Sequence, residues 1–169
     1  PGTMIVATAE GAGKNVITGI AGKPGFSSIT IEKDMMNSEV GFTRKVLSVL
    51  ESEDISFEHM PSGIDTLSII LATPVLEGKK ERILRAVCDA VSPDSVFVED
   101  SIALIAVVGR GMRSTKGTAA RTLDAVAGAG INLVMIDQGS SELNIILGVK
   151  EAELQKTIAA IYNEFGNRK

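Results

Sequence analysis

The sequence predicts an α+β protein made of two ferredoxin-like βαββαβ units, whose antiparallel sheets carry their helices on one face. The first observation behind this prediction is an internal repeat with a period of about 76 residues. The second is that each copy alternates short β-branched runs with apolar residues at helical spacing. A third, the number of strands in each copy, indicates that the first unit is inserted into the second.

The repeat appears when the sequence is compared with itself at an offset of 76 positions. Gly41 then falls on Gly117, and Ile55 falls on Ile131. The same offset places residues 67–71 (LSIIL) on residues 143–147 (LNIIL), where only the second position differs. An ungapped offset that holds across a helix and two strands indicates two copies of one structural unit.

The first copy begins with a strand over 28–33 and a polar loop over 34–40. A helix is expected next, because Phe42, Val46 and Leu50 recur at helical spacing, and Asp54 stands where this helix should stop. Strands over 56–60 and 66–72 follow, then a second helix on Ile83 and Val87, and a last strand over 95–100. We expect Cys88, within that second helix, to be a buried thiol.

The second copy repeats this order with strands over 102–108, 132–137 and 143–149. Its helices are expected on Ala119, Leu123 and Val126, with a stop at Gly130, and over 154–165. Copy two ends without a fourth strand, which would leave a sheet edge unpaired. The unassigned run 15–21 (NVITGIA) precedes copy one and reads as a strand, so we expect it to complete the sheet of copy two. A neighbouring copy or a dimer would cover the bare sheet faces.

Composition excludes several classes of function. The chain has 17 Lys and Arg against 21 Asp and Glu, and aromatic residues make up only 4%, so it carries no signature of nucleic-acid binding. One His and one Cys build neither a structural zinc site nor a disulfide framework. The apolar runs are too short to span a membrane, and no signal peptide is visible. We therefore expect no metal site, no catalytic residues and a cytoplasmic location.

Four stretches resemble a known family, the bacterial aspartate kinases (aspartokinases), in their regulatory portion of two tandem ACT domains. They are 15–22 (NVITGIAG), 36–60 (MNSEVGFTRKVLSVLESEDISFEHM), 107–112 (VVGRGM) and 130–137 (GINLVMID). The resemblance covers residues 14–165. It implies ACT domain 1 at 25–100, ACT domain 2 at 15–24 plus 101–169, and the end of a catalytic domain or a linker at 1–14.

The resemblance also implies a function. The chain begins at Pro1 and resembles a fragment or a separately made small subunit, without the kinase that uses ATP and magnesium to phosphorylate aspartate. It is expected to have no cofactor and no catalysis of its own. It would bind lysine, threonine or both, and restrain a catalytic domain or large subunit as a homodimer in the pathway to lysine, threonine and methionine.

A bound amino acid needs partners for its carboxylate and its ammonium. A helix N-terminus suits the first, Gly41 allows close backbone approach there, and Glu58 is a candidate for the second. By resemblance the effector lies between this loop, the helix start and the second strand of an adjacent ACT unit. The implied contacts are Met36, Ser38, Glu39, Val40, Gly41, Phe42, Thr43, Ser56, Phe57, Glu58, Ser62, Asn132 and Ile136.

Copy two has Val134 at the position of Glu58, so we expect copy one to carry the main effector contacts. Copy two would then serve mostly pairing, with Asn132 reaching a partner's site. Two alternatives stay open. One is a constitutive ACT-type dimerisation or assembly module with a degenerate ligand site, in which Glu58 is a solvated strand residue and Gly41 only a turn glycine. The other is an enzyme on a ferredoxin-like scaffold, which a single His without a clustered acid–base set disfavours.

Overall fold

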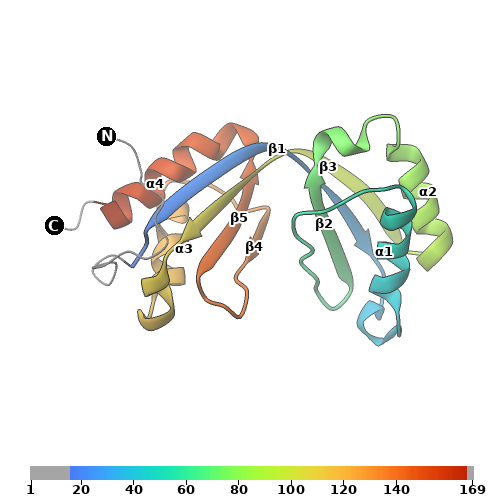
Figure 1. Ribbon diagram of the computed structural model, residues 1–169, viewed down its shortest axis with the longest axis horizontal. Helices are drawn as coiled ribbons and strands as arrows, with labels where there is room; N and C mark the ends of the chain where they lie inside the picture. Colours follow the sequence, from blue (N-terminus) through green and yellow to red (C-terminus); the bar gives the residue numbers. More distant parts are fainter. Residues whose placement is uncertain (1–15, 167–169) are drawn as a thin grey trace. The chain divides into compact units, whose positions relative to one another are not determined.

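The computed structural model describes residues 16–166 (Figure 1). The expected domain segment 1–14 and the first residue of the expected strand 15–21 lie outside this range. The chain forms two compact units. The central unit comprises Pro24–Ala103 and Lys150–Ala152, and the described part of the terminal unit comprises residues 16–23, Leu104–Val149 and residues 153–166.

Two long strands contribute to both units. Strand β1 runs from Gly19 to Glu32 and strand β3 from Ser95 to Val108. The expectation of two separate short strands in each of these stretches is wrong. Gly25 and Ser101, which stand 76 positions apart, both have a positive φ, of 88° and 62°. Where the sequence indicated a break between two strands, β1 and β3 each contain a single left-handed residue and continue through it.

The central unit has the strand order β2-β1-β3, with β2 at Thr66–Ala72. Strands β1 and β2 are antiparallel, with Ile29 opposite Ile69. Helices α1 (Phe42–Ser52) and α2 (Lys80–Val91) lie beside each other over this sheet (Figure 1). Since side chains alternate along a strand, one set of apolar residues meets the helices and forms the core: Ile29, Ile31, Leu67, Ile69, Leu71, Val46, Leu50, Ile83 and Val87.

The expected strand over 56–60 does not form, and the structure has two isolated bridges in its place. His59 pairs with Ile70, and Ser62 pairs with Leu67. The amides of Glu58 and His59 both point to the carbonyl of Ile70, at 2.8 and 3.4 Å. Pro61 then lacks an N–H group, so a regular ladder cannot continue through it.

The terminal unit has the strand order β1-β3-β5-β4, to which β1 contributes Gly19 to Lys23. Strands β4 (Met135–Asp137) and β5 (Asn144–Lys150) are antiparallel. The expected strand 132–137 is shorter than predicted, because its paired register with β5 begins only at Met135 opposite Gly148. Helices α3 (Thr118–Gly128) and α4 (Leu154–Gly166) pack against each other.

Segment 19–23 packs closely against α4 within the terminal unit. A Cβ atom placed on Gly22 would lie 2.7 Å from the Cδ1 atoms of both Leu154 and Ile158. The amide of Thr18 donates to the carbonyl of Val108 at 2.8 Å. This segment is therefore part of the same packed unit as β3, β5 and α4.

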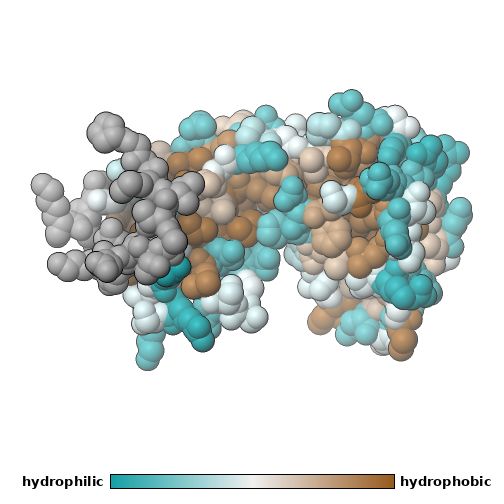
Figure 2. Space-filling model, viewed as in Figure 1, coloured by the Kyte–Doolittle hydropathy of each residue, from teal (hydrophilic) through white to brown (hydrophobic). Residues whose placement is uncertain are grey.

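The expectation that Cys88 is buried is wrong, because the structure exposes it. Helix α2 buries Ile83, Val87 and Val91. Cys88 follows Val87 and therefore lies about 100° around the helix axis from this buried stripe. Figure 2 shows hydrophilic residues gathered on the outer side of α2. Within the part of the chain that the structure describes, no helix has both the length and the apolar character needed to span a membrane.

Candidate functional site

The start of α1 borders a pocket of about 270 Å³ within the central unit. The pocket is formed by the loop before α1, the first residues of α1 and the turn before β2. Its lining residues are Met36, Asn37, Glu39, Gly41, Phe42, Thr43, Arg44, Ser62 and Gly63. The structure thus brings six of the predicted contacts together: Met36, Glu39, Gly41, Phe42, Thr43 and Ser62.

Gly41 determines how the backbone enters α1. It is the N-cap residue, with φ 81° and ψ 9°, and no side chain caps the helix. This left-handed conformation favours glycine. Within residues 16–166, the amides of Thr43 and Arg44 donate to no protein acceptor. These two N–H groups and the positive end of the helix dipole suit a carboxylate.

Three backbone groups of the loop before α1 are held by other parts of the central unit. The amide of Asp34 donates to Asp94 Oδ2 at 2.6 Å, and the amide of Met35 donates to Asp65 Oδ1 at 3.0 Å. The amide of Asn37 donates to the carbonyl of Ile64 at 3.1 Å. These bonds keep the loop against the turn before β2, which forms the opposite wall of the pocket.

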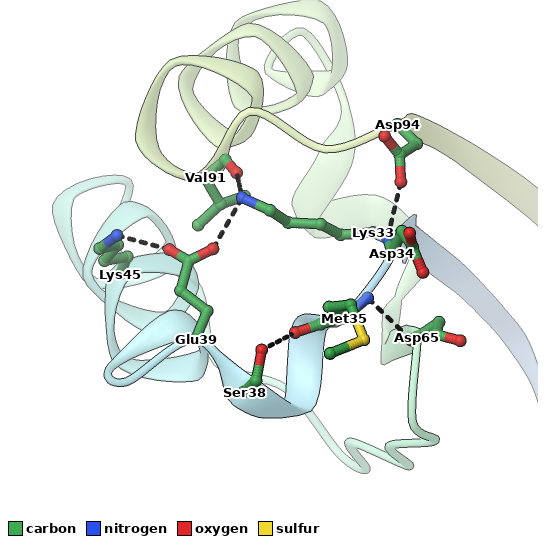
Figure 3. A network of polar contacts seen from close by, with 9 residues as sticks. All are labelled: Lys33, Asp34, Met35, Ser38, Glu39, Lys45, Asp65, Val91 and Asp94. Atoms are coloured by element: carbon green, nitrogen blue, oxygen red, sulfur yellow. Dashed lines mark hydrogen bonds and ion pairs between the residues drawn. The ribbon is translucent and has the colours of Figure 1, made fainter.

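Glu39 is engaged by two lysines (Figure 3). Its Oε2 lies 2.7 Å from Lys33 Nζ, and its Oε1 lies 2.7 Å from Lys45 Nζ. Hydrogen bonds from Lys33 and then from Lys45 hold the pKa of the Glu39 carboxyl below its ordinary value. Glu39 therefore lines the pocket as an ionised carboxylate whose charge is balanced by two lysines.

The other predicted residues of the central unit lie elsewhere. Ser56 and Phe57 line a second pocket of about 680 Å³ along α1, and Arg44 borders both pockets. The Ser38 hydroxyl donates to the carbonyl of Met35 at 2.7 Å. Val40 is 95% exposed. Glu58 is exposed and lines neither pocket.

Asn132 and Ile136 belong to the terminal unit. Both are exposed, and neither is among the residues that line the pocket at α1. Ile136 lies in β4. Their predicted contact with an effector stays a prediction.

Reasoning from the sequence missed Asn37 and Arg44 as lining residues. Asn37 lies inside the loop before α1, where loop lengths vary and positions could not be matched to those of the family. For Arg44 a signal was available, since it occupies the third helical position after Gly41, where the backbone N–H groups are still unpaired.

Comparison with known proteins places the chain in one group. Residues 105–165 match the family model of the ACT domain. Aspartokinase 3 of Bacillus subtilis is 43% identical over 165 residues, which are 97% of this chain and 36% of that protein. The chain thus spans about a third of the length of this relative.

Two solved structures are also similar to this chain. The aspartate kinase of Clostridium acetobutylicum matches with a TM-score of 0.89 and 45% identity, over 94% of this chain and 37% of that one. The regulatory subunit of aspartate kinase from Thermus flavus matches with a TM-score of 0.74 and 20% identity, over 88% of this chain and 98% of that one. The second match supports the fold alone.

Proposed function

Because the chain corresponds to the regulatory ACT portion of an aspartokinase, we propose that it is an allosteric sensor of lysine, threonine or both. Binding of the amino acid would restrain the kinase by feedback. The chain would not phosphorylate aspartate by itself and would act on a catalytic domain or large subunit. The observation that carries this proposal is the pocket at the start of α1.

The pocket supplies the contacts that an amino-acid carboxylate needs. The amides of Thr43 and Arg44 offer hydrogen bonds at the positive end of α1. Gly41 has no side chain, and a Cβ placed there would lie 3.9 Å from Arg44 Nε. A volume of about 270 Å³ accommodates one amino acid, which is smaller than the drug-sized ligands of typical pockets.

The partner for the α-ammonium would come from a second chain. Glu39 is already occupied by two lysines, and Glu58 lines neither of the two pockets described above. The family resemblance implies an effector that sits between the loop of one ACT unit and the second strand of an adjacent one. In this proposal a homodimer brings Glu58 of one chain to the α1 pocket of the other.

We also propose that the two compact units are two ACT domains, with the central one inserted into the terminal one. The backbone supports this reading, because equivalent residues have equivalent geometry. Asp54 and Gly130 each stand two residues after the last residue of α1 and α3, with φ 54° and 68°, and Met36 and Met112 are each 6% exposed. The ACT match over 105–165 covers the terminal half.

Feedback requires that the amino acid binds one state of the assembly better than another. A site completed by two chains meets this condition, because only the correctly paired state offers both halves of the site. A rearrangement of the dimer would then change its affinity for the amino acid. By linkage, binding of the amino acid would shift the equilibrium between the arrangements of the dimer.

Calorimetric titration of the 169-residue chain with lysine and threonine, singly and together, tests the proposal. We expect saturable binding of at least one of them, and a rise in unfolding free energy of about 2.7 kcal/mol at a hundredfold excess over Kd. No heat and no thermal shift with either amino acid would instead favour the constitutive assembly module.

A further inference from the structure

We propose that Lys33, Glu39 and Lys45 form an electrostatic clip that sets the conformation of residues 33–41. The clip thereby sets the affinity of the pocket at the start of α1 for an amino acid. In this proposal Glu39 is a positioning residue and does not contact the effector. The inference rests on the proposed function of the pocket and adds how its affinity is determined.

The clip joins three segments of the central unit. Lys33 lies just after β1, Glu39 lies in the loop, and Lys45 lies in the first turn of α1. Each carboxylate oxygen of Glu39 has its own lysine at 2.7 Å (Figure 3). Because the two bonds leave Glu39 in different directions, they restrain both ends of the loop against each other.

Lys33 extends the clip to α2. Its Nζ also donates to the carbonyl of Val91 at 2.5 Å, the last residue of α2. A cation at a helix C-terminus satisfies a carbonyl that has no partner within the helix and interacts favourably with the helix dipole. The same Nζ lies 5.8 Å from the centre of the Phe42 ring. The loop is therefore tied to the ends of two helices.

The same contacts argue against a direct role of Glu39 in binding an ammonium group. Both of its oxygens face lysine cations, and its side chain is only 27% exposed. An incoming ammonium would have to displace Lys33 or Lys45 from a charge-assisted bond. A loop held in one conformation, by contrast, improves affinity, because less ordering remains for the ligand to impose.

The repeat shows that the clip belongs to one unit. At the offset of 76 positions, Lys33 and Glu39 correspond to Gly109 and Thr115, which cannot form these ion pairs. Lys45 corresponds to Arg121, whose Nε bonds Glu164 Oε1 on α4 at 2.7 Å. The loop of the central unit thus has a restraint that its counterpart cannot have.

The variant Lys45→Met separates positioning from contact, because the two roles predict opposite signs. If Glu39 positions the loop, this variant weakens the binding of lysine or threonine by about 3–10-fold. If Glu39 contacts the ammonium, loss of Lys45 frees its carboxylate and strengthens binding. Glu39→Gln should weaken binding as well, and the double variant should be no weaker than either single one, because each change breaks the same clip.

A matched control is the ion pair between Arg82 and Glu53, in the same unit. Arg82 Nε donates to Glu53 Oε1 at 2.8 Å, and neither residue lines the pocket at α1. Glu53→Gln should change thermal stability without changing the Kd for either amino acid. Tighter or unchanged binding by Lys45→Met at wild-type stability would overturn the clip.

Hydrogen exchange of the free chain decides the proposal even if no amino acid binds. We expect the amides of residues 35–41 to exchange about tenfold faster in Glu39→Gln and Lys45→Met than in the wild type. Glu53→Gln should leave their exchange unchanged. If the wild-type chain binds neither amino acid but both variants exchange faster, the sensor is refuted and the clip is kept. Unchanged exchange in both variants would refute the clip.

Discussion

Gly41 and Gly117 begin α1 and α3 with the same backbone conformation, since φ is 81° at both and ψ is 9° and 6°. Neither helix has a side-chain cap. The two glycines stand 76 positions apart, so the repeat in the sequence is also a repeat in local geometry. Around Gly41 the structure has a pocket whose lining includes six of the predicted contacts.

This equivalence provides a matched pair of variants. Gly41→Ala and Gly117→Ala should each lower the unfolding free energy by about 1–2 kcal/mol, because the left-handed conformation is unfavourable for a residue with a Cβ atom. Space does not limit either change: a Cβ would meet only Arg44 Nε, at 3.9 Å, at Gly41, and nothing within 4 Å at Gly117. Urea unfolding measures both effects.

Only Gly41→Ala should also weaken amino-acid binding in calorimetry. Equal affinity in the two variants would place the binding site away from α1.

Glu58→Ala tests the proposed partner of the ammonium. The side chain is exposed, so the change should alter unfolding free energy by no more than about 0.5 kcal/mol. If Glu58 binds the ammonium across a dimer, the variant should weaken lysine and threonine binding about tenfold or more in calorimetry. Asp89→Ala, at an exposed position of α2, is the control, and wild-type affinity in Glu58→Ala would leave Glu58 without this role.

Gly22→Ala tests the packing of β1 in the terminal unit. The new Cβ would approach the Cδ1 atoms of Leu154 and Ile158 to 2.7 Å, and such overpacking costs about 1–3 kcal/mol. Ile158→Val removes one of these methyl groups, so the double variant should regain part of the loss in urea unfolding. Additive destabilisation in the double variant would argue against this contact.

Stability should decrease in acid, and Glu39 should contribute to the decrease. Its pKa is lowered by the hydrogen bonds from Lys33 and Lys45, as that of Glu53 is lowered by Arg82 and that of Asp100 by Ser27 and Lys80. A carboxyl group with a lowered pKa stabilises the fold above its unfolded value and loses this contribution as the pH falls through the folded value.

Unfolding free energy should therefore decline below pH 4.5, the ordinary value for Glu39 and Glu53. Glu39→Gln should reduce the slope of this decline, and Glu39→Gln combined with Glu53→Gln should reduce it further. Chemical denaturation at a series of pH values measures the slopes. A wild-type slope in Glu39→Gln would contradict the role of the two lysines.

Much of the central unit could be predicted from local patterns. The helical spacing of Phe42, Val46 and Leu50 placed α1, and all three residues are buried. A helix depends mainly on residues three and four positions apart, so its sequence contains most of the information needed. The pocket was partly predictable for the same reason, because Gly41 and the first helical residues are contiguous.

Strand boundaries were less predictable, because pairing depends on distant residues. The run 56–60 has the composition of a strand, yet Pro61 and the shared carbonyl of Ile70 limit it to isolated bridges. Separate strands were expected over 15–21 and 28–33, and over 95–100 and 102–108, although β1 and β3 each continue through a single left-handed residue, Gly25 or Ser101.

The repeat, the helices, the glycine that precedes α1 and the family resemblance can all be read from the order of residues, because they depend on nearby residues and on similarity to other chains. Which charges meet depends on the folded chain. Glu39 is held by Lys33 and Lys45 because β1, the loop and α1 converge there, and Lys33 also meets Val91, 58 positions away. Such pairs depend on the packing of whole elements, which no local pattern of residues contains.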